Sequence, residues 1–328
     1  MDTKANGLSG LLKHLIVKTI LYTFTLIVAH LAKSFLLLPR LDANRDSSQR
    51  GVGEGSEFVS YPKDPLLSGV GGCSSAKEDL YYGVVLAMKR PDAFFGRKTV
   101  STPQFFLLHG PPGTGKTMLA TAAAAEAGVP LLSLNASNLE SKWYGDTPRI
   151  LDKVFRDARE RYSPCVLFFD EIDSIGRRRN EMDCASSYTL KCELLRNLDT
   201  LKGSPVCVVA CTNCPGSLDP ALRRRFAKEV RVGLPDENER LSILEAITVE
   251  ERWNKMRRGK VLKEVSRLTS GYSGSDLASL YSSVKVERMK ANLDMVLSSP
   301  SSTALPPLCL RQWMEGMKGE KGMIRDTK

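Results

Sequence analysis

The chain has 328 residues, of which 42% are hydrophobic and 26% are charged. This composition is that of a globular protein of about two packed domains, and it excludes a long disordered chain. The net charge of +10 is shared among the N-terminal, central and C-terminal portions of the chain. A nucleic-acid partner is therefore not expected, because its binding surface would concentrate basic residues.

An apolar stretch without acidic residues lies near the N-terminus. Leu11–Leu38 contains three lysines and no Asp or Glu. A membrane-spanning helix needs about 20 apolar residues, and Lys18 and Lys33 can extend their ammonium groups toward lipid headgroups. We therefore predict a single transmembrane helix within residues 1–40. An amphipathic helix on the membrane surface and an organelle transit peptide are the alternatives.

The flanks of this stretch predict an orientation and a linker. More basic residues follow the apolar stretch than precede it, which favours a cytosolic position for the remainder of the chain. The segment 41–62 that follows is polar and rich in glycine and serine. Such a composition is typical of a flexible linker.

A phosphate-binding loop follows a predicted buried strand. The apolar run Phe105–His109 leads into Gly110–Thr117 (GPPGTGKT), and the Ala-rich stretch Met118–Ala127 follows. Strand, glycine-rich loop and helix form the context that the motif G-x-x-x-x-G-K-[ST] requires. We expect Lys116 to contact the β and γ phosphates of a nucleotide, and Thr117 to ligate Mg²⁺. The predicted nucleotide contacts of the loop are Gly110, Pro111, Pro112, Gly113, Thr114, Gly115, Lys116, Thr117 and Met118.

Two more apolar strands end in polar residues. Cys165–Phe169 precedes Asp170 and Glu171, and Val206–Cys211 precedes a Thr and Asn213. The carboxyl ends of parallel strands meet at one edge of a sheet, so these side chains are expected beside the phosphate loop. We assign Asp170 to the Mg²⁺ shell, Glu171 to polarising the attacking water, and Asn213 to orienting that water.

Three consecutive arginines, Arg223, Arg224 and Arg225, follow a short predicted helix. They are either a solvated face or a cationic group that completes the hydrolytic site of a neighbouring subunit.

Together these motifs resemble those of AAA ATPases over about residues 66–290. The matching segments, in the order of that family, are GPPGTGKT at 110–117, FFDEID at 168–173, Thr212–Asn213, LDPALRRRF at 218–226 and Gly271–Leu277. The resemblance implies a three-layer α/β P-loop domain with a parallel sheet, followed by a small helical lid. It also implies ATP and Mg²⁺ as ligands and a hexameric ring, in which Arg224 and Arg225 act on the neighbouring subunit's nucleotide. Val70 and Gly71 would then contact adenine, and Gly274 and Ser275 would belong to the lid's nucleotide-sensing region.

A further motif indicates the subgroup. Ser141–Asp146 (SKWYGD) is similar to the pore loop of the meiotic clade, which includes katanin, spastin, the ATPase that disassembles ESCRT-III and membrane-anchored extractors of tail-anchored proteins. In a ring, Lys142, Trp143 and Tyr144 would grip a chain in the central channel. One departure from the family pattern is Glu229, which stands where relatives commonly have Arg.

The predicted organisation is an anchor at 1–40, a linker at 41–62, an ATPase domain at 63–235 and a lid at 236–328. This layout resembles that of the extractors, so we predict an ATP-driven translocase that threads membrane proteins through its pore. The ATPase domain would face the cytosol from the mitochondrial outer membrane or the peroxisome. The alternatives are a remodeller of soluble substrates that severs microtubules or disassembles ESCRT-III, and a nucleotide-gated membrane scaffold.

Overall fold

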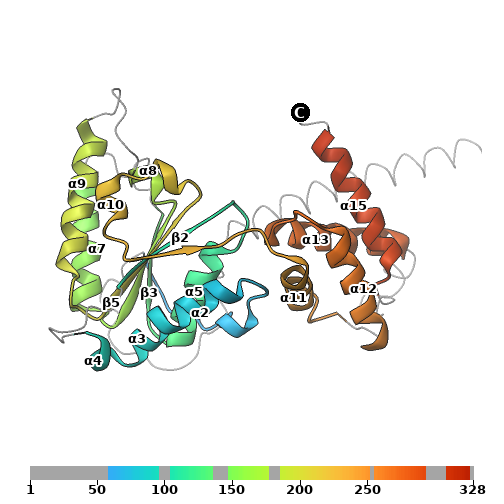
Figure 1. Cartoon of the computed structure of the whole chain (residues 1–328), viewed down its shortest axis with the longest axis horizontal. Coiled ribbons are helices and arrows are strands. Elements are labelled where there is room, and N and C mark those ends of the chain that lie inside the picture. The colour runs from blue at the N-terminus through green and yellow to red at the C-terminus, as the bar shows by residue number, and fades with distance from the viewer. Residues whose placement is uncertain are drawn as a thin grey trace, which may run out of the picture. The chain divides into compact units, whose positions relative to one another are not determined.

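The computed structural model describes residues 58–95, 104–135, 147–176, 185–251, 255–292 and 308–325. All of them lie within one compact unit, residues 56–328 (Figure 1). The predicted membrane helix within 1–40, most of the linker at 41–62 and the predicted pore loop Lys142–Tyr144 lie outside the described residues. Among the helices of the described ranges, none is long and apolar enough to cross a bilayer.

A six-stranded sheet organises the first part of the unit, with the strand order β1-β3-β4-β5-β2-β6. The short edge strand β1 pairs with β3 antiparallel, and every other neighbouring pair is parallel. This confirms the predicted α/β fold, and the sheet is parallel as predicted except at the edge strand β1. The strands are β1 (Val59–Ser60), β2 (Phe105–His109), β3 (Leu131–Asn135), β4 (Cys165–Asp170), β5 (Val206–Thr212) and β6 (Lys228–Arg231).

Helices cover both faces of the sheet because the strand side chains alternate between two apolar layers. Phe105 and Leu107 pack with α7 and α9, whereas Phe106 and Leu108 pack with α2 and α5 (Figure 1). The helices of this part are η1 (Leu67–Gly69), α2 (Ser74–Leu80), the π-helix η2 (Tyr81–Val85), α3 (Leu86–Lys89), α4 (Pro91–Phe94), α5 (Lys116–Ala127), α7 (Thr147–Glu160), α8 (Asp173–Gly176), α9 (Ala185–Thr200), η3 (Pro215–Ser217) and α10 (Pro220–Arg223).

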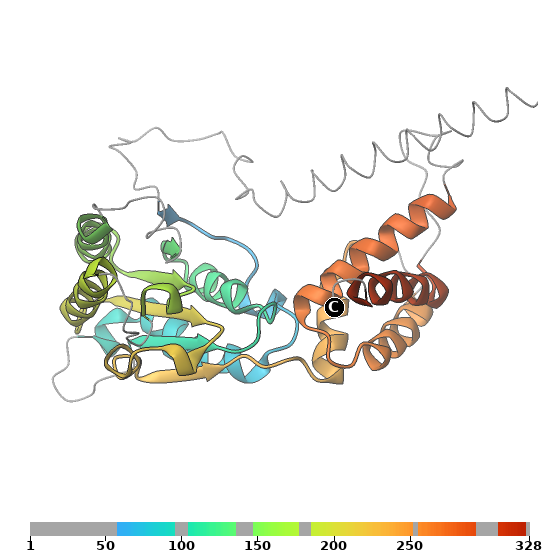
Figure 2. The ribbon, with the colours of Figure 1, turned by 90° about the horizontal axis from the view of Figure 1, so that it is seen from above.

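Helices alone follow β6 within the described residues. They are α11 (Glu237–Ile247), α12 (Lys255–Leu268), α13 (Gly274–Ala291) and α15 (Leu310–Arg325). Their apolar residues form a core separate from the two layers around the sheet, and α12, α13 and α15 pack together in it (Figure 2). The fully buried Trp313 stacks on Tyr281 there, with ring centroids 6.0 Å apart. These helices lie within residues 236–328, the range predicted to be the lid, and are called the lid below.

A half-buried ionic network fastens the lid helices. Glu251, which follows α11, accepts hydrogen bonds from Tyr281 Oη at 2.7 Å and from Arg288 Nη1 at 2.8 Å. Burial acts to raise the pKa of Glu251, but the hydrogen bonds from Arg288 and Tyr281 outweigh it and lower that pKa. The network therefore stabilises the folded lid most where Glu251 is ionised.

We expect Glu251→Gln to lower the free energy of unfolding at pH 7 by about 1–3 kcal/mol, because hydrogen bonds to a charged carboxylate are lost. The folded-state pKa lies below the ordinary value of 4.5, so the contribution is present above that value and is lost as the pH falls below it. The difference between the two proteins should therefore shrink from pH 7 to pH 4 in urea titrations.

The matched control is Glu264→Gln, which removes a carboxylate from an exposed ion pair with Arg267 on α12. This change should cost less than about 1 kcal/mol at pH 7. An equal loss in the two variants would contradict the role given to Glu251.

Candidate nucleotide-binding site

The phosphate loop connects β2 to α5, and its glycines are required by the backbone. Gly113 and Gly115 have φ of +74° and +90°, in a region that residues with side chains rarely adopt. A Cβ on Gly110 would lie 1.9 Å from the carbonyl oxygen of Val232, just after β6. The loop therefore holds its shape only with glycine at these positions.

Lys116 opens α5 and turns its side chain back over the loop. Its ammonium donates hydrogen bonds to the carbonyl oxygens of Gly110 at 3.0 Å and Pro111 at 2.8 Å. Burial lowers the pKa of Lys116, and the negative charges of Asp170 and Asp173 are among the influences that oppose this shift. The cation thus lies at the loop, where it can neutralise phosphate oxygens.

The other predicted loop contacts differ in exposure. Thr114 is buried, and its hydroxyl donates to the carbonyl of Pro111 at 2.9 Å. The thiol of Cys73 donates to the carbonyl of Thr114 at 3.8 Å. Pro112 and Met118 are exposed, so both are accessible to a ligand.

A hydroxyl and a carboxylate lie together at the start of α5 and the end of β4. Thr117 Oγ1 donates to Asp170 Oδ2 at 2.9 Å, and the backbone N–H of Glu171 donates to Asp170 Oδ1 at 3.1 Å. Oxygen ligands of this kind suit Mg²⁺. Glu171 is exposed and has a φ of +51°, and such backbone conformations in residues other than glycine cluster at functional sites.

The end of β5 is fastened to the segment after β4. The hydroxyl of Thr212 donates to Asp173 Oδ1 at 2.7 Å and accepts from the backbone N–H of Cys214 at 3.0 Å. Asn213 lies between these anchored residues and is exposed. Sequence reasoning did not assign Asp173 a role, although the residue belongs to the FFDEID motif.

The lid reaches the phosphate loop through the N-terminus of α13. The backbone N–H of Ser275 donates to the carbonyl of Gly113 at 3.0 Å. Ser273 caps α13 in a reciprocal arrangement with Asp276, and Gly274 is the first residue of the helix. The structure therefore brings Gly274 and Ser275 to the loop, where the positive end of the helix dipole favours an anion.

The segment expected to contact adenine also lies against the lid. Val70 is buried, and the backbone N–H of Gly72 donates to Ser242 Oγ on α11 at 3.4 Å. A Cβ on Gly71 would lie 2.4 Å from the Cα of Ile243, so only glycine fits this approach of two backbones. Val70 and Gly71 are thus held beside α11. The same short segment also reaches the phosphate loop, because Cys73 contacts Thr114.

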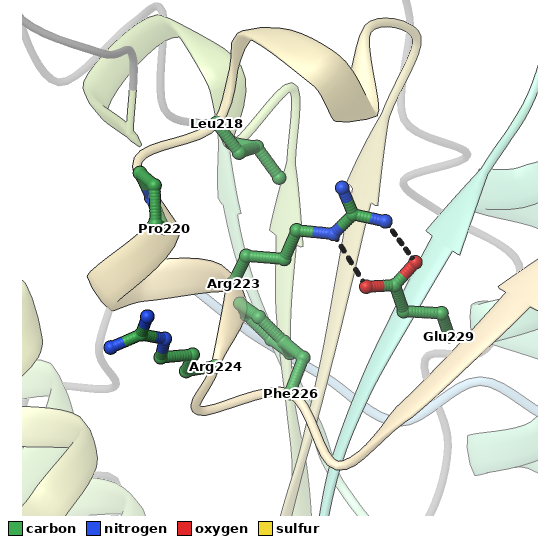
Figure 3. A pocket seen from close by; sticks show the side chains of 6 residues that line it. All are labelled: Leu218, Pro220, Arg223, Arg224, Phe226 and Glu229. Carbon is green, nitrogen blue, oxygen red and sulfur yellow. Dashed lines mark hydrogen bonds and ion pairs between the residues drawn. The ribbon is translucent and has the colours of Figure 1, made fainter.

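The three consecutive arginines have unlike surroundings, and Figure 3 shows those of Arg223 and Arg224. Arg223 forms an ion pair with Glu229, and Arg225 forms one with Asp199 at 2.8 Å. The hydrogen bond between Arg223 and Glu229 raises the pKa of the arginine and lowers that of the glutamate. Arg224 is exposed and makes no side-chain hydrogen bond or ion pair within the described residues.

Comparison with known proteins agrees with this geometry. The family model "ATPase family associated with various cellular activities (AAA)" matches residues 106–234. The crystal structure of the FIGL-1 AAA domain in complex with ADP is 31% identical, with a TM-score of 0.67. That similarity covers 80% of this chain and 87% of the solved one. The chain belongs to the AAA ATPase family.

The curated relatives define the subgroup more closely. The chain is 37% identical over 228 residues to fidgetin-like protein 1 of Caenorhabditis elegans, and 40% identical over 227 residues to spastin of Ixodes scapularis. It is 35% identical over 224 residues to the outer mitochondrial transmembrane helix translocase of Danio rerio. These matches cover 69%, 68% and 67% of this chain and 38%, 34% and 58% of the respective relatives. The chain is therefore of the fidgetin and spastin type within the meiotic clade, and it spans less than two thirds of the length of these relatives.

The contact between lid and loop has a measurable consequence at Gly113. We expect Gly113→Ala to raise the Kd for ATP by at least about tenfold. A tenfold rise in Kd corresponds to a loss of only about 1.4 kcal/mol of binding free energy. A Cβ there would lie 2.8 Å from Ser273 Oγ and 2.9 Å from Ser275 Cβ, so either the loop or the lid must move. A fluorescent ATP analogue measures the affinity.

Gly128→Ala is the matched control, because Gly128 has a φ of +71° and no atom lies within 4 Å of the place that a Cβ would take. Both variants lose about 1–2 kcal/mol of folding free energy from backbone strain. Weakened ATP binding in the control as well would mean that general destabilisation, not the lid contact, governs affinity.

Proposed function

We propose that the chain hydrolyses ATP in a ring and uses the energy to remodel protein substrates. The observation that carries this proposal is the convergence of Lys116, Thr117, Asp170 and the α13 N-terminus on one loop. The arginine segment, Asp219–Arg225, forms no hydrogen bond or ion pair with these residues within the described part of its own chain. The segment is thus available to a neighbouring subunit. Such a subunit would be present in the hexameric ring that AAA ATPases generally form.

Each residue of the site has a distinct task in this proposal. Lys116 neutralises the phosphate oxygens at the loop. Thr117 and Asp170 hold Mg²⁺, which neutralises charge on the phosphates when it is bound. Glu171 polarises the attacking water and Asn213 orients it, since both are exposed at the same edge of the sheet. Arg224 of a neighbouring subunit approaches the developing negative charge, whereas Arg225, which the family resemblance also assigns to this task, is paired with Asp199 of its own subunit.

Movement follows from the same contacts. The carbonyl of Gly113 binds the backbone of Ser275, and Gly72 binds Ser242, so both ends of the nucleotide pocket are joined to the lid. A change in the phosphate loop during hydrolysis therefore displaces the lid relative to the sheet. In the ring, this displacement would move Trp143 and Tyr144 along the channel and pull the substrate stepwise.

Soluble protein assemblies are the substrate class that we favour. The relatives of the fidgetin and spastin type support it, and within the meiotic clade it corresponds to severing microtubules or disassembling ESCRT-III. Extraction of membrane proteins is the second candidate function. The similarity to the outer mitochondrial transmembrane helix translocase and the apolar stretch Leu11–Leu38 support it.

The test of the proposed function is Glu171→Gln. We expect kcat for ATP to fall by about 10²–10⁴-fold with little change in KM, because the carboxylate acts on water and not on bound nucleotide. Glu160→Gln, at an exposed position that ends α7, is the control and should retain the wild-type rate. Equal rates for wild type and Glu171→Gln would contradict hydrolysis at this site.

The same assay distinguishes the two substrate classes. ATPase rates of the full chain and of a chain lacking residues 1–40 are compared with polymerised tubulin, with ESCRT-III filaments and with liposomes carrying a tail-anchored protein. Stimulation by filaments that survives the truncation supports the soluble class. Stimulation by the liposomes alone, lost on truncation, supports extraction.

A further inference from the structure

Arg223 is fixed by a two-point ion pair with Glu229 of β6. Its Nε donates to Oε1 of Glu229 at 2.6 Å, and its Nη2 donates to Oε2 at 2.7 Å (Figure 3). Such parallel hydrogen bonds fix the plane of the guanidinium as well as its position. Arg223 is therefore directed toward its own sheet.

The other two attachments of the arginine segment lead to α9. Asp219, at the start of α10, accepts from the backbone N–H of Ala221 and forms an ion pair with the buried Lys191 at 2.8 Å. At the far end, Arg225 donates to Asp199 and to the carbonyl of Ala221, each at 2.8 Å. The segment is thus held to α9 before and after Arg224, and to β6 through Arg223.

Arg224 is the one member of the triplet without a carboxylate partner among the described residues. Figure 3 shows its side chain extending away from the pair of Arg223 and Glu229. It lines an open surface pocket of about 410 Å³, together with the Arg223–Glu229 pair and the side chains of Leu218, Pro220 and Phe226. Two of three adjacent positive charges are therefore neutralised within the subunit, and the third is presented at the surface.

We propose that Glu229 is a positioning residue for ATP hydrolysis: by clamping Arg223 against β6, it leaves Arg224 as the cation offered to the neighbouring subunit's nucleotide. This inference rests on the proposed function, in which the arginines complete a site on the next subunit. Glu229 itself touches no nucleotide and acts only through the arginine segment.

Glu229 affects Arg224 through the charge of Arg223, which lies next to it. Without the carboxylate, the guanidinium of Arg223 would be free beside that of Arg224, and the two like charges would repel and compete for one anion. A displacement of about 1 Å in a catalytic group can lower the rate about 100-fold, so even a modest displacement of Arg224 should be measurable. The ion pair is exposed, so its removal should hardly affect folding.

The first experiment measures ATPase kinetics of Glu229→Ala and Glu229→Gln in the full chain. We expect kcat to fall by about 10- to 100-fold, with KM for ATP changed less than about twofold, because each subunit's own phosphate loop is intact. The exchanged pair, Arg223→Glu with Glu229→Arg, should recover part of the loss. Glu264→Ala, which breaks the comparable exposed pair with Arg267 on the lid, should retain the wild-type rate.

The second experiment tests whether the defect acts on the neighbouring subunit. Glu229→Ala subunits have an intact Glu171, and Glu171→Gln subunits have an intact arginine segment. Mixed rings should therefore hydrolyse ATP faster than either variant alone, because one subunit supplies what the other lacks. A damaged pocket within the Glu229→Ala subunit itself would give no such gain.

Arg224→Ala mixed with Glu171→Gln serves as the reference. If this reference mixture gains activity and the Glu229→Ala mixture does not, the positioning role is overturned while the proposed function stands. If the reference mixture also fails to gain, the shared site between subunits is wrong, and the role of Glu229 falls with it. A wild-type kcat for Glu229→Ala would likewise overturn the inference.

Discussion

The backbone of the phosphate loop is confined from two sides, and the arrangement of the site depends on this confinement. Gly110 lies against the carbonyl of Val232 at the exit of β6, and the carbonyl of Gly113 accepts the backbone N–H of Ser275 from the lid. Neither approach leaves room for a side chain. The loop therefore connects the sheet to the lid, and a ligand that alters the shape of the loop would also shift the lid relative to the sheet.

A second set of charges lies on the segment that joins β5 to β6, and the proposed function assigns it to the nucleotide of a neighbouring subunit. The carboxyl ends of β4 and β5 bring Asp170, Glu171 and Asn213 beside the loop, as expected for nucleotide sites in parallel sheets. The arginine segment lies between β5 and β6 in the sequence and is fastened to α9 and β6 by ion pairs. In the proposed ring, one chain would thus carry both the receiving residues and the donating arginines of a shared catalytic site.

Local motifs in the sequence predicted the chemistry of the site, because the glycine-rich loop and the strand ends use neighbouring residues. Contacts between distant segments were not predictable in this way. The hydrogen bond from Ser275 to Gly113 joins the lid helices to the phosphate loop, and the ion pair of Arg225 with Asp199 spans 26 positions. Glu229 was recognised as a departure from the family pattern, but its partner became evident only from the side-chain geometry with Arg223. The predicted anchor and pore loop lie outside the described residues, so both stay predictions.

The most direct test of a site shared between subunits is the ATPase rate per subunit as a function of protein concentration. The account requires the rate to rise steeply as rings assemble and then to reach a plateau, because an isolated subunit lacks the neighbouring Arg224. Parallel light scattering should show assembly over the same concentration range. A rate per subunit that stays constant from the monomeric to the assembled state would contradict the account, since each chain would then contain a complete catalytic site.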